Sequence, residues 1–176
     1  IRVPKGCRLR PTSDMVREAL FNILPPMTGS AFLDLYAGCG TVGLEAASRG
    51  AARSLFVERD PLLAKAIRAA AESLGLADRT EVMAADAERA IRVLSSRGER
   101  FDFIFIDPPY EKGLIEPTLE GIVGKYPGSS GSCYRSTCGR RRRANGFDRR
   151  SGTDGPEAVR KHPPVILAGK VDPMAE

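Results

Sequence analysis

Apolar residues recur along the first 126 residues with two different periods. They occur at helical spacing between Asp14 and Leu24, and mostly apolar runs separated by polar or glycine-rich turns follow. The pattern predicts helices over 14–24, 42–49, 60–74 and 88–94, and strands over 31–36, 54–58, 80–84 and 101–106. This order is typical of an α/β fold with a mostly parallel, doubly wound sheet.

Two parts of this pattern predict how the elements pack. The run 101–106 is the most hydrophobic of the predicted strands, and we expect it at the centre of the sheet, where both faces are covered. The apolar face of the first helix is predicted to comprise Val16, Ala19, Leu20, Ile23 and Leu24.

Charge divides the chain into two parts. Residues 1–126 contain 17 Lys and Arg and 17 Asp and Glu, whereas residues 127–176 contain 10 and 5 and supply the whole net charge of +5. The second part is also rich in Gly, Ser and Pro, and within it only 165–168 has the pattern of a strand. Composition therefore predicts a globular domain over 1–126 and a basic, weakly ordered tail over 127–176.

Composition also argues against several classes of protein. No apolar stretch reaches the roughly 18 residues of a membrane helix, and the N-terminal residues lack the pattern of a signal peptide. The four cysteines are scattered and His162 is the single histidine, so we expect neither a metal site nor a disulfide framework. A cytoplasmic protein is expected.

A glycine motif follows the first predicted strand. Gly38, Gly40 and Gly43 fit the G-x-G-x-x-G pattern between a strand and a helix, which allows a tight turn, a close approach by a ligand and close helix packing. Glu58 stands at the end of the second strand, where a carboxylate can accept hydrogen bonds from ribose hydroxyls. We interpret the motif as a binding site for an adenosine-containing cofactor. The alternative is that these glycines only allow a tight turn.

The charge of Asp34 discriminates between cofactors. A carboxylate so close to the glycine loop would repel the pyrophosphate of a dinucleotide, but it suits the amine and sulfonium of S-adenosylmethionine. A structural carboxylate bonded to loop amides is the alternative. Asp86 could receive the adenine amino group, with the Ala87 amide on a ring nitrogen, although an Asp there is also a good N-cap.

A second motif, Asp107-Pro108-Pro109-Tyr110, directly follows the last predicted strand. The two prolines predict a rigid turn at the carboxyl end of that strand, where open α/β sheets bind ligands. Asp107 and the Pro108 carbonyl could accept the two N–H bonds of a planar amino group while Tyr110 stacks on its ring. This arrangement indicates methylation of an exocyclic amine by orientation and electrostatic stabilisation. It does not distinguish DNA, RNA and protein-amide substrates.

Several segments, spread over about residues 5–120, together resemble one known family. They are Arg10-Pro11-Thr12-Ser13-Asp14, Val16-Arg17-Glu18-Ala19-Leu20-Phe21-Asn22-Ile23-Leu24, Leu33-Asp34-Leu35-Tyr36-Ala37-Gly38-Cys39-Gly40, Gly43-Leu44-Glu45-Ala46, Phe56-Val57-Glu58 and Asp107-Pro108-Pro109-Tyr110. The sequence resembles the bacterial RsmD family of 16S ribosomal RNA guanine-N2 methyltransferases. The resemblance implies a class I methyltransferase fold over 1–126, S-adenosylmethionine as methyl donor and a small-subunit guanine as acceptor.

The resemblance also implies roles for individual residues. The cofactor would be lined by Asp34, Tyr36, Gly38, Gly40 and Glu58. The base would contact Asp107, Pro108, Pro109 and Tyr110.

The N-terminal residues are expected to contact RNA. Four cations occur in the first ten residues, namely Arg2, Lys5, Arg8 and Arg10, while residues 1–126 as a whole are neutral. We predict that the cations contact phosphates. The resemblance implies that the family's Arg-Pro-Thr segment, here Arg10, Pro11 and Thr12, lies near the substrate, together with Arg8. A solvated terminus is the alternative. The expected partner is 16S rRNA or the assembled small subunit, bound by a monomer.

Two departures from the family pattern qualify these expectations. The family's N-terminal hairpin looks cut short, and the resemblance stops near Tyr126, where Arg, Gly, Ser and Pro take over. A reading-frame shift is one hypothesis for this change, and resequencing the DNA would test it. In that case the strand 101–106 would be an exposed edge of the sheet.

Other functions are compatible with parts of the sequence. A nicotinamide-dependent oxidoreductase would use the glycine motif, but it explains neither Asp34 nor the Asp-Pro-Pro-Tyr turn. A homologue that binds cofactor or RNA without catalysis is a second alternative. An adenine or a glutamine amide as acceptor is a third.

Overall fold

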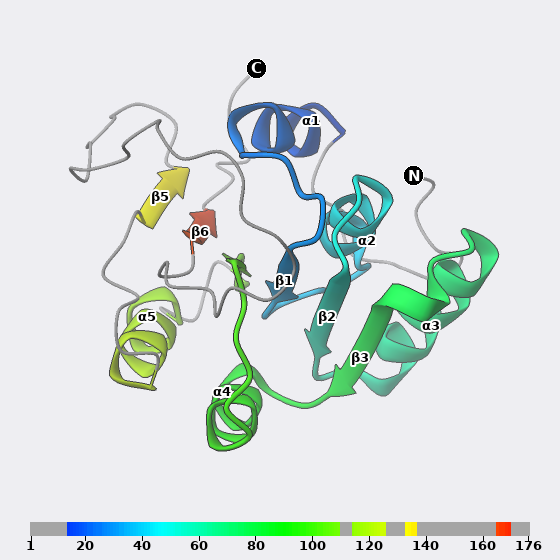
Figure 1. The fold of residues 1–176 in the computed structure, drawn as a ribbon. Coiled ribbons are helices and arrows are strands. Elements are labelled where there is room, and N and C mark those ends of the chain that lie inside the picture. Colours follow the sequence, from blue (N-terminus) through cyan, green and yellow to red (C-terminus); the bar gives the residue numbers. More distant parts are fainter. Residues whose placement is uncertain (1–13, 110–113, 126–132, 137–164, 170–176) are drawn as a thin grey trace.

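A computed structural model of the chain describes residues 14–109, 114–125, 133–136 and 165–169 (Figure 1). The helices are α1 (Asp14–Ile23), α2 (Thr41–Ser48), α3 (Pro61–Ser73), the 3₁₀ helix η1 (Ala77–Arg79), α4 (Ala87–Ser96) and α5 (Ile115–Lys125). The strands are β1 (Ala31–Asp34), β2 (Arg53–Glu58), β3 (Thr80–Ala84), β4 (Phe103–Ile106), β5 (Cys133–Ser136) and β6 (Val165–Gly169). The eight predicted elements are confirmed to within two or three residues at each end.

The strands form one sheet in the order β3-β2-β1-β4-β6-β5, and every neighbouring pair is parallel. The predicted parallel sheet is therefore confirmed. β4 pairs with β1 on one side and with β6 on the other, which confirms the central position expected for the most hydrophobic strand. In this register the carboxyl ends of β2, β1 and β4 lie next to one another, because Asp34 pairs with both Phe56 and Phe105.

Helices cover both faces of the sheet, as a doubly wound fold requires. One face carries Leu33, Leu55 and Ile104, which pack with Ile91 of α4 and Ile122 of α5. On the opposite face, buried side chains of the three central strands pack against α1, α2 and α3; they are Phe32, Phe56, Phe103 and Phe105. Alternate residues of each strand thus point to opposite layers, and Figure 1 shows α4 and α5 away from α1 and α2.

The buried face of α1 only partly matches the prediction, since Leu20 and Leu24 pack against the core. Ile23 is 67% exposed and Ala19 is exposed, whereas Arg17 and Phe21 are buried. The Phe21 ring lies 6.3 Å from that of Phe32, so the aromatic contact with β1 fixes which side of α1 is covered. Apolar spacing alone could not show this rotation, because the covered side includes an arginine.

The chain after β4 contains elements that the sequence analysis did not predict. β6 confirms the strand-like pattern at 165–168, but β5 was not expected, and neither was α5. Pro117 falls in the first turn of α5, where the missing N–H of proline costs no helical hydrogen bond. The expectation that β4 would be an exposed edge is wrong, because β6 pairs with it along its whole length.

Candidate functional site

Three carboxylates gather at the carboxyl edge of the central strands. Asp34 and Glu58 are the last residues of β1 and β2, and Asp107 directly follows β4. Within the strands, Asp34 and Glu58 occupy the alternate positions that face α1–α3, and Asp107 continues the same alternation after Phe105. The structure therefore brings together on one face three residues that are far apart in the sequence.

The glycine loop is built around Glu58. Its Oε2 accepts a hydrogen bond of 2.8 Å from the Gly38 N–H, and its Oε1 accepts one of 2.8 Å from the Asp60 N–H. The Ala37 N–H donates to the Val57 carbonyl at 3.0 Å, so the loop continues the pairing of β1 with β2. Each carboxylate oxygen has a further lone pair, which leaves Glu58 able to accept bonds from a ligand.

The glycines of the motif serve two geometric needs. Gly40 caps α2 in the left-handed region, at φ 73°, which side chains rarely adopt. At Gly43 a Cβ would lie 2.3 Å from the Phe56 ring carbon Cε1, so a side chain there would drive α2 away from β2. The predicted close packing of the helix on the sheet is therefore visible. The Gly43 N–H, in the first turn of α2, donates a hydrogen bond to the Asp34 carboxylate, as the positive end of a helix favours.

Asp34 is the most strongly perturbed acid of the site. It is 1% exposed, and burial together with the neighbouring charges of Asp107 and Glu58 raises its pKa to about 7. The backbone N–H groups of Tyr36 and Gly43 act in the opposite direction on this pKa. Its Oδ1 has no hydrogen-bond partner in the structure. A buried carboxylate with an unpaired oxygen is costly and suits a cationic ligand.

Asp107 lies close enough to Asp34 for the two charges to interact. Burial raises the pKa of Asp107 to about 6, so it is mainly ionised at neutral pH. In the turn that follows, Pro108 is buried and Pro109 is exposed. Tyr110 lies outside the described residues, so the predicted stacking ring stays a prediction.

Tyr36 makes a contact that sequence reasoning missed. Its hydroxyl and that of Thr118 in α5 are 2.7 Å apart, and Thr118 is buried. The Tyr36 hydroxyl is thus occupied by α5, which leaves the ring as the part of this side chain that could contact a cofactor. No spacing in the sequence links residues 82 positions apart.

The remaining predicted residues divide into those the structure describes and those it does not. Asp86 caps α4 by accepting a hydrogen bond of 2.8 Å from the Arg89 N–H, which confirms the predicted N-cap, while its contact with adenine stays a prediction. Ala87 begins α4, with its N–H among those that have no partner inside the helix. The residues predicted to contact RNA lie outside the described part; they are Arg2, Lys5, Arg8, Arg10, Pro11 and Thr12.

Two further observations bear on the chemistry. Cys39 of the glycine loop is disulfide-bonded, although the scattered cysteines gave no reason to expect a disulfide. Within the described residues there is no group of three or more His, Cys, Asp or Glu that could hold a metal ion.

Comparison with known proteins identifies the family. The family described as Conserved hypothetical protein 95 matches residues 1–126, which is well over half of the chain. The chain belongs to this family, the RsmD family. Its fold is that of the class I S-adenosylmethionine-dependent methyltransferases.

Three relatives illustrate the similarity of this RsmD-family chain to other members. Ribosomal RNA small subunit methyltransferase D of Escherichia coli is 37% identical over 66% of this chain and 58% of its own length. YlbH of Bacillus subtilis, named provisionally as an rRNA methyltransferase, is 37% identical over 72% of this chain and 68% of its own. A solved Escherichia coli structure, named provisionally as a methyltransferase, is 36% identical with a TM-score of 0.58, and covers 66% of this chain and 64% of its own. The chain thus spans about three fifths to two thirds of the length of these relatives.

Proposed function

We propose that this protein transfers a methyl group from S-adenosylmethionine to the exocyclic N2 amine of a guanine in small-subunit ribosomal RNA. The observation that carries the proposal is the buried carboxylate of Asp34, with an unpaired oxygen, beside the carboxylate of Asp107. The relatives named as rRNA methyltransferases support RNA as the substrate class.

The residues of the site fit the proposed cofactor. The unpaired Oδ1 of Asp34 would accept a hydrogen bond from the amine of the cofactor. The carboxylates of Asp34 and Glu58 would offset the positive charges of the cofactor. Glu58 would also accept hydrogen bonds from the ribose hydroxyls, and the Ala87 N–H would donate to the adenine ring. When bound, S-adenosylmethionine supplies an electrophilic methyl group. The same carboxylates would repel a pyrophosphate, which disfavours a nicotinamide dinucleotide.

The turn after β4 would hold the acceptor. Asp107 would accept one N–H of the guanine amine and the Pro108 carbonyl the other, with Tyr110 stacked on the base. Two acceptors favour the pyramidal amine, whose lone pair is localised on nitrogen. Breaking the sulfonium S–CH3 bond would leave S-adenosylhomocysteine and a methylated, positively charged nitrogen, and an ionised Asp107, whose pKa is about 6, would accept the proton that this nitrogen releases.

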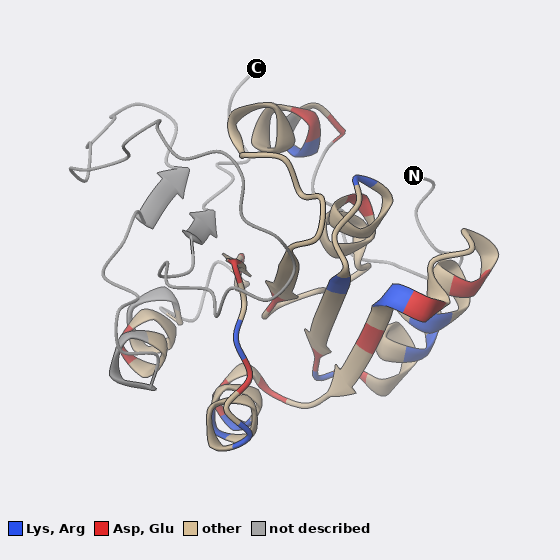
Figure 2. Ribbon diagram, viewed as in Figure 1, with Lys and Arg blue, Asp and Glu red and all other residues tan. Residues whose placement is uncertain are grey.

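The RNA-binding surface would include the N-terminal cations, with the protein acting as a monomer on 16S rRNA or the small subunit, in the cytoplasm. In the described part, Figure 2 shows Lys and Arg on several elements, among them α1, α2, α3 and α4.

A methyl-transfer assay tests the proposal. Small subunits purified from cells lacking this modification would be incubated with radiolabelled S-adenosylmethionine, and the methylated nucleoside identified by mass spectrometry. We expect N2-methylguanosine from the wild-type chain and at least a roughly hundredfold slower reaction from Asp107→Asn. Asp78→Asn, which changes an exposed carboxylate of η1, is the matched control and should react normally.

Three outcomes would contradict this function. Methylation of adenine or of a protein amide would reassign the acceptor. Tight cofactor binding without turnover would indicate a non-catalytic binder. Preferential binding of a nicotinamide dinucleotide in a parallel titration would overturn the cofactor assignment.

A further inference from the structure

Asp34 and Asp107 lie at the ends of neighbouring strands, on the same face of the sheet. Asp34 pairs with Phe105 across β1 and β4, and Asp107 follows Phe105 by two residues, which returns it to that face. The Leu35 N–H donates to the Phe105 carbonyl at 3.0 Å, so the two strands are still hydrogen-bonded where the acids meet. The sheet therefore sets the relative position of the two carboxylates.

Neither carboxylate has a positive partner in the part of the chain that the structure describes. Asp34 is 1% exposed, its Oδ1 accepts no hydrogen bond, and none of the salt bridges between described residues includes either acid. On the other side of β4, the neighbouring strand β6 carries no charged residue. The charge of Asp107 acts on Asp34, and because a Coulomb interaction is mutual, the charge of Asp34 acts on Asp107. Ionising either acid therefore makes the other harder to ionise.

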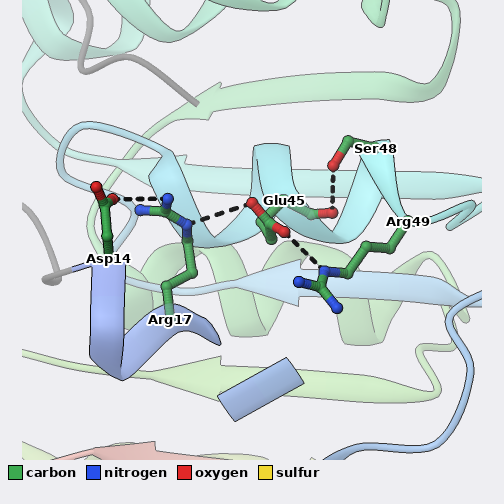
Figure 3. Close-up of polar contacts among 5 residues, drawn as sticks. All are labelled: Asp14, Arg17, Glu45, Ser48 and Arg49. Carbon is green, nitrogen blue, oxygen red and sulfur yellow. Dashed lines mark hydrogen bonds and ion pairs between the residues drawn. The ribbon is translucent and has the colours of Figure 1, made fainter. Parts of the chain in front are cut away.

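The other charged groups around this face do not neutralise the pair. Glu58 at the end of β2 also raises the pKa of Asp34. The charged groups of α1 and α2 are exposed or joined in the network that Figure 3 shows; they are Asp14, Arg17, Glu18, Glu45 and Arg49. Those that follow β2 and those on α3 are exposed; they are Arg59, Asp60, Lys65, Arg68 and Glu72. A positive charge from a bound ligand would therefore allow both acids to ionise together.

We propose that Asp34 and Asp107 form a coupled acid pair that responds to the charge on the cofactor sulfur: both are ionised beside the sulfonium, and the pair takes up a proton when that charge is lost. The inference rests on the proposed function, in which the cofactor amine lies at Asp34 and the acceptor amine at Asp107. S-adenosylmethionine and S-adenosylhomocysteine have the same amine and the same carboxylate, and they differ at sulfur by one methyl group and one positive charge. The pair would therefore distinguish them by charge.

The pair accounts for the charge that the reaction moves. As the acceptor nitrogen bonds to the methyl carbon, the electron pair of the S–CH3 bond stays on sulfur, which becomes neutral. The positive charge passes to the nitrogen and leaves it as a proton. Asp107 receives this proton at the stage when no sulfonium favours its ionised form, so it becomes a stronger base when a base is needed. The product complex keeps the proton on the pair, and the total charge of the site is unchanged.

Binding of the two forms of the cofactor tests the pair without turnover. The Kd of S-adenosylmethionine and that of S-adenosylhomocysteine would be measured on the full chain by isothermal titration calorimetry. The ratio of the second Kd to the first should rise at least about threefold between about pH 6 and about pH 8, because the S-adenosylhomocysteine complex holds more protons. The amine and the carboxylate occur in both ligands, so their own titration cancels in this ratio.

Variants separate the pair from other titrating groups. In Asp107→Asn the ratio should stay constant within about 1.5-fold over the same pH range, because the remaining acid faces the amine that both ligands share. Asp78→Asn, which changes an exposed acid of η1, is the matched control and should follow the wild type. In the free protein, carboxyl NMR titrations should show that Asp107→Asn lowers the pKa of Asp34, and that Asp34→Asn lowers the pKa of Asp107 by the same amount, since coupling is reciprocal.

The outcomes distinguish this inference from the proposed function. A ratio that is constant with pH in the wild type, or a rise that persists in Asp107→Asn, would show that the two acids do not act as a pair, even if the chain methylates RNA. If an Asn variant does not fold, the wild-type ratio decides. If the ratio rises as expected but no RNA is methylated, the function fails while the acid pair stands. If neither ligand binds, both are wrong.

Discussion

The carboxylate of Asp34 lies inside the protein, and the charges of Asp107 and Glu58 act on it from adjacent strands. With a pKa of about 7, it changes charge within the physiological pH range. A cationic ligand would bind the ionised form and displace its proton. The affinity of the site for such a ligand should therefore depend on pH.

The first prediction concerns this dependence. The affinity for S-adenosylmethionine should rise as the pH increases from about 6 and level off above about 7.5, since only the ionised Asp34 attracts the cationic ligand. Isothermal titration calorimetry across this range, in buffers of different ionisation enthalpy, should also detect proton release on binding. Asp34→Asn should bind weakly at every pH. An equally steep dependence in that variant would show that another group titrates.

The second prediction concerns the stability of the free protein. The folded state keeps a proton on Asp34 that the unfolded chain, with a pKa near 3.8, has already released. Stability from this group is therefore complete below about pH 4 and is lost as the pH rises through about 7. Asp34→Asn, neutral throughout, should exceed the wild type by about 2–4 kcal/mol at pH 8 and by much less at pH 5. Urea unfolding at both values measures the gap; a constant gap would contradict the account.

At this scale the sequence predicted where the acidic residues lie better than which side of α1 is buried. Asp34, Glu58 and Asp107 follow predicted strands, so their meeting at one edge could be inferred from the parallel order. The buried side of α1 could not be inferred from the sequence, because a search for apolar spacing leaves Arg17 out. That residue is buried through Asp14 and Glu45, and Glu45 lies in a different helix.

At the scale of elements, one hydrogen bond links the glycine loop to α5, the helix that follows the Asp-Pro-Pro turn. Tyr36 lies between Asp34 and the glycines, and Thr118 lies one turn into α5. α5 also packs on the sheet through Ile122, in the same cluster as Ile91 of α4.

The third prediction tests this link. Thr118→Val replaces the hydroxyl with a methyl group of similar size, leaves the Tyr36 hydroxyl unpaired and should cost about 1–2 kcal/mol of folding free energy. Tyr36→Phe should lower the free energy of unfolding by a similar amount, and the double variant should lower it no more than either single variant. Chemical denaturation measures these differences. Thr118→Ser, which keeps the hydroxyl, is the matched control. Additive losses in the double variant would show that the two groups do not interact.

The elements that the sequence missed share a physical cause. The only helical start signal near the beginning of α5 is Pro117, in its first turn. β5 is a short segment within a polar, Arg-rich region. β6 has a visible apolar pattern, but its place beside β4 depends on pairing between strands distant in sequence. Local patterns carry no information about such pairings.

At the scale of the whole molecule, β6 completes the sheet next to β4. The fourth prediction follows: a chain ending at Lys125 should be less stable and aggregate more readily than the full chain, since its β4 backbone would be an unpaired edge. Light scattering and thermal unfolding would measure both effects. Removal of 170–176 alone is the control and should have little effect. If the chain ending at Lys125 behaves normally, the pairing with β6 does not contribute to stability.

The strand order also has a consequence for folding during synthesis on the ribosome. Phe103 of β4 is synthesised 62 residues before its partner Val165. While those residues are still being added, one side of the most apolar strand has no neighbour, although β1, β2 and β3 are already available. The nascent chain must therefore pass through a stage in which the edge of β4 is unpaired and prone to aggregation. A chaperone would be of most benefit at this stage.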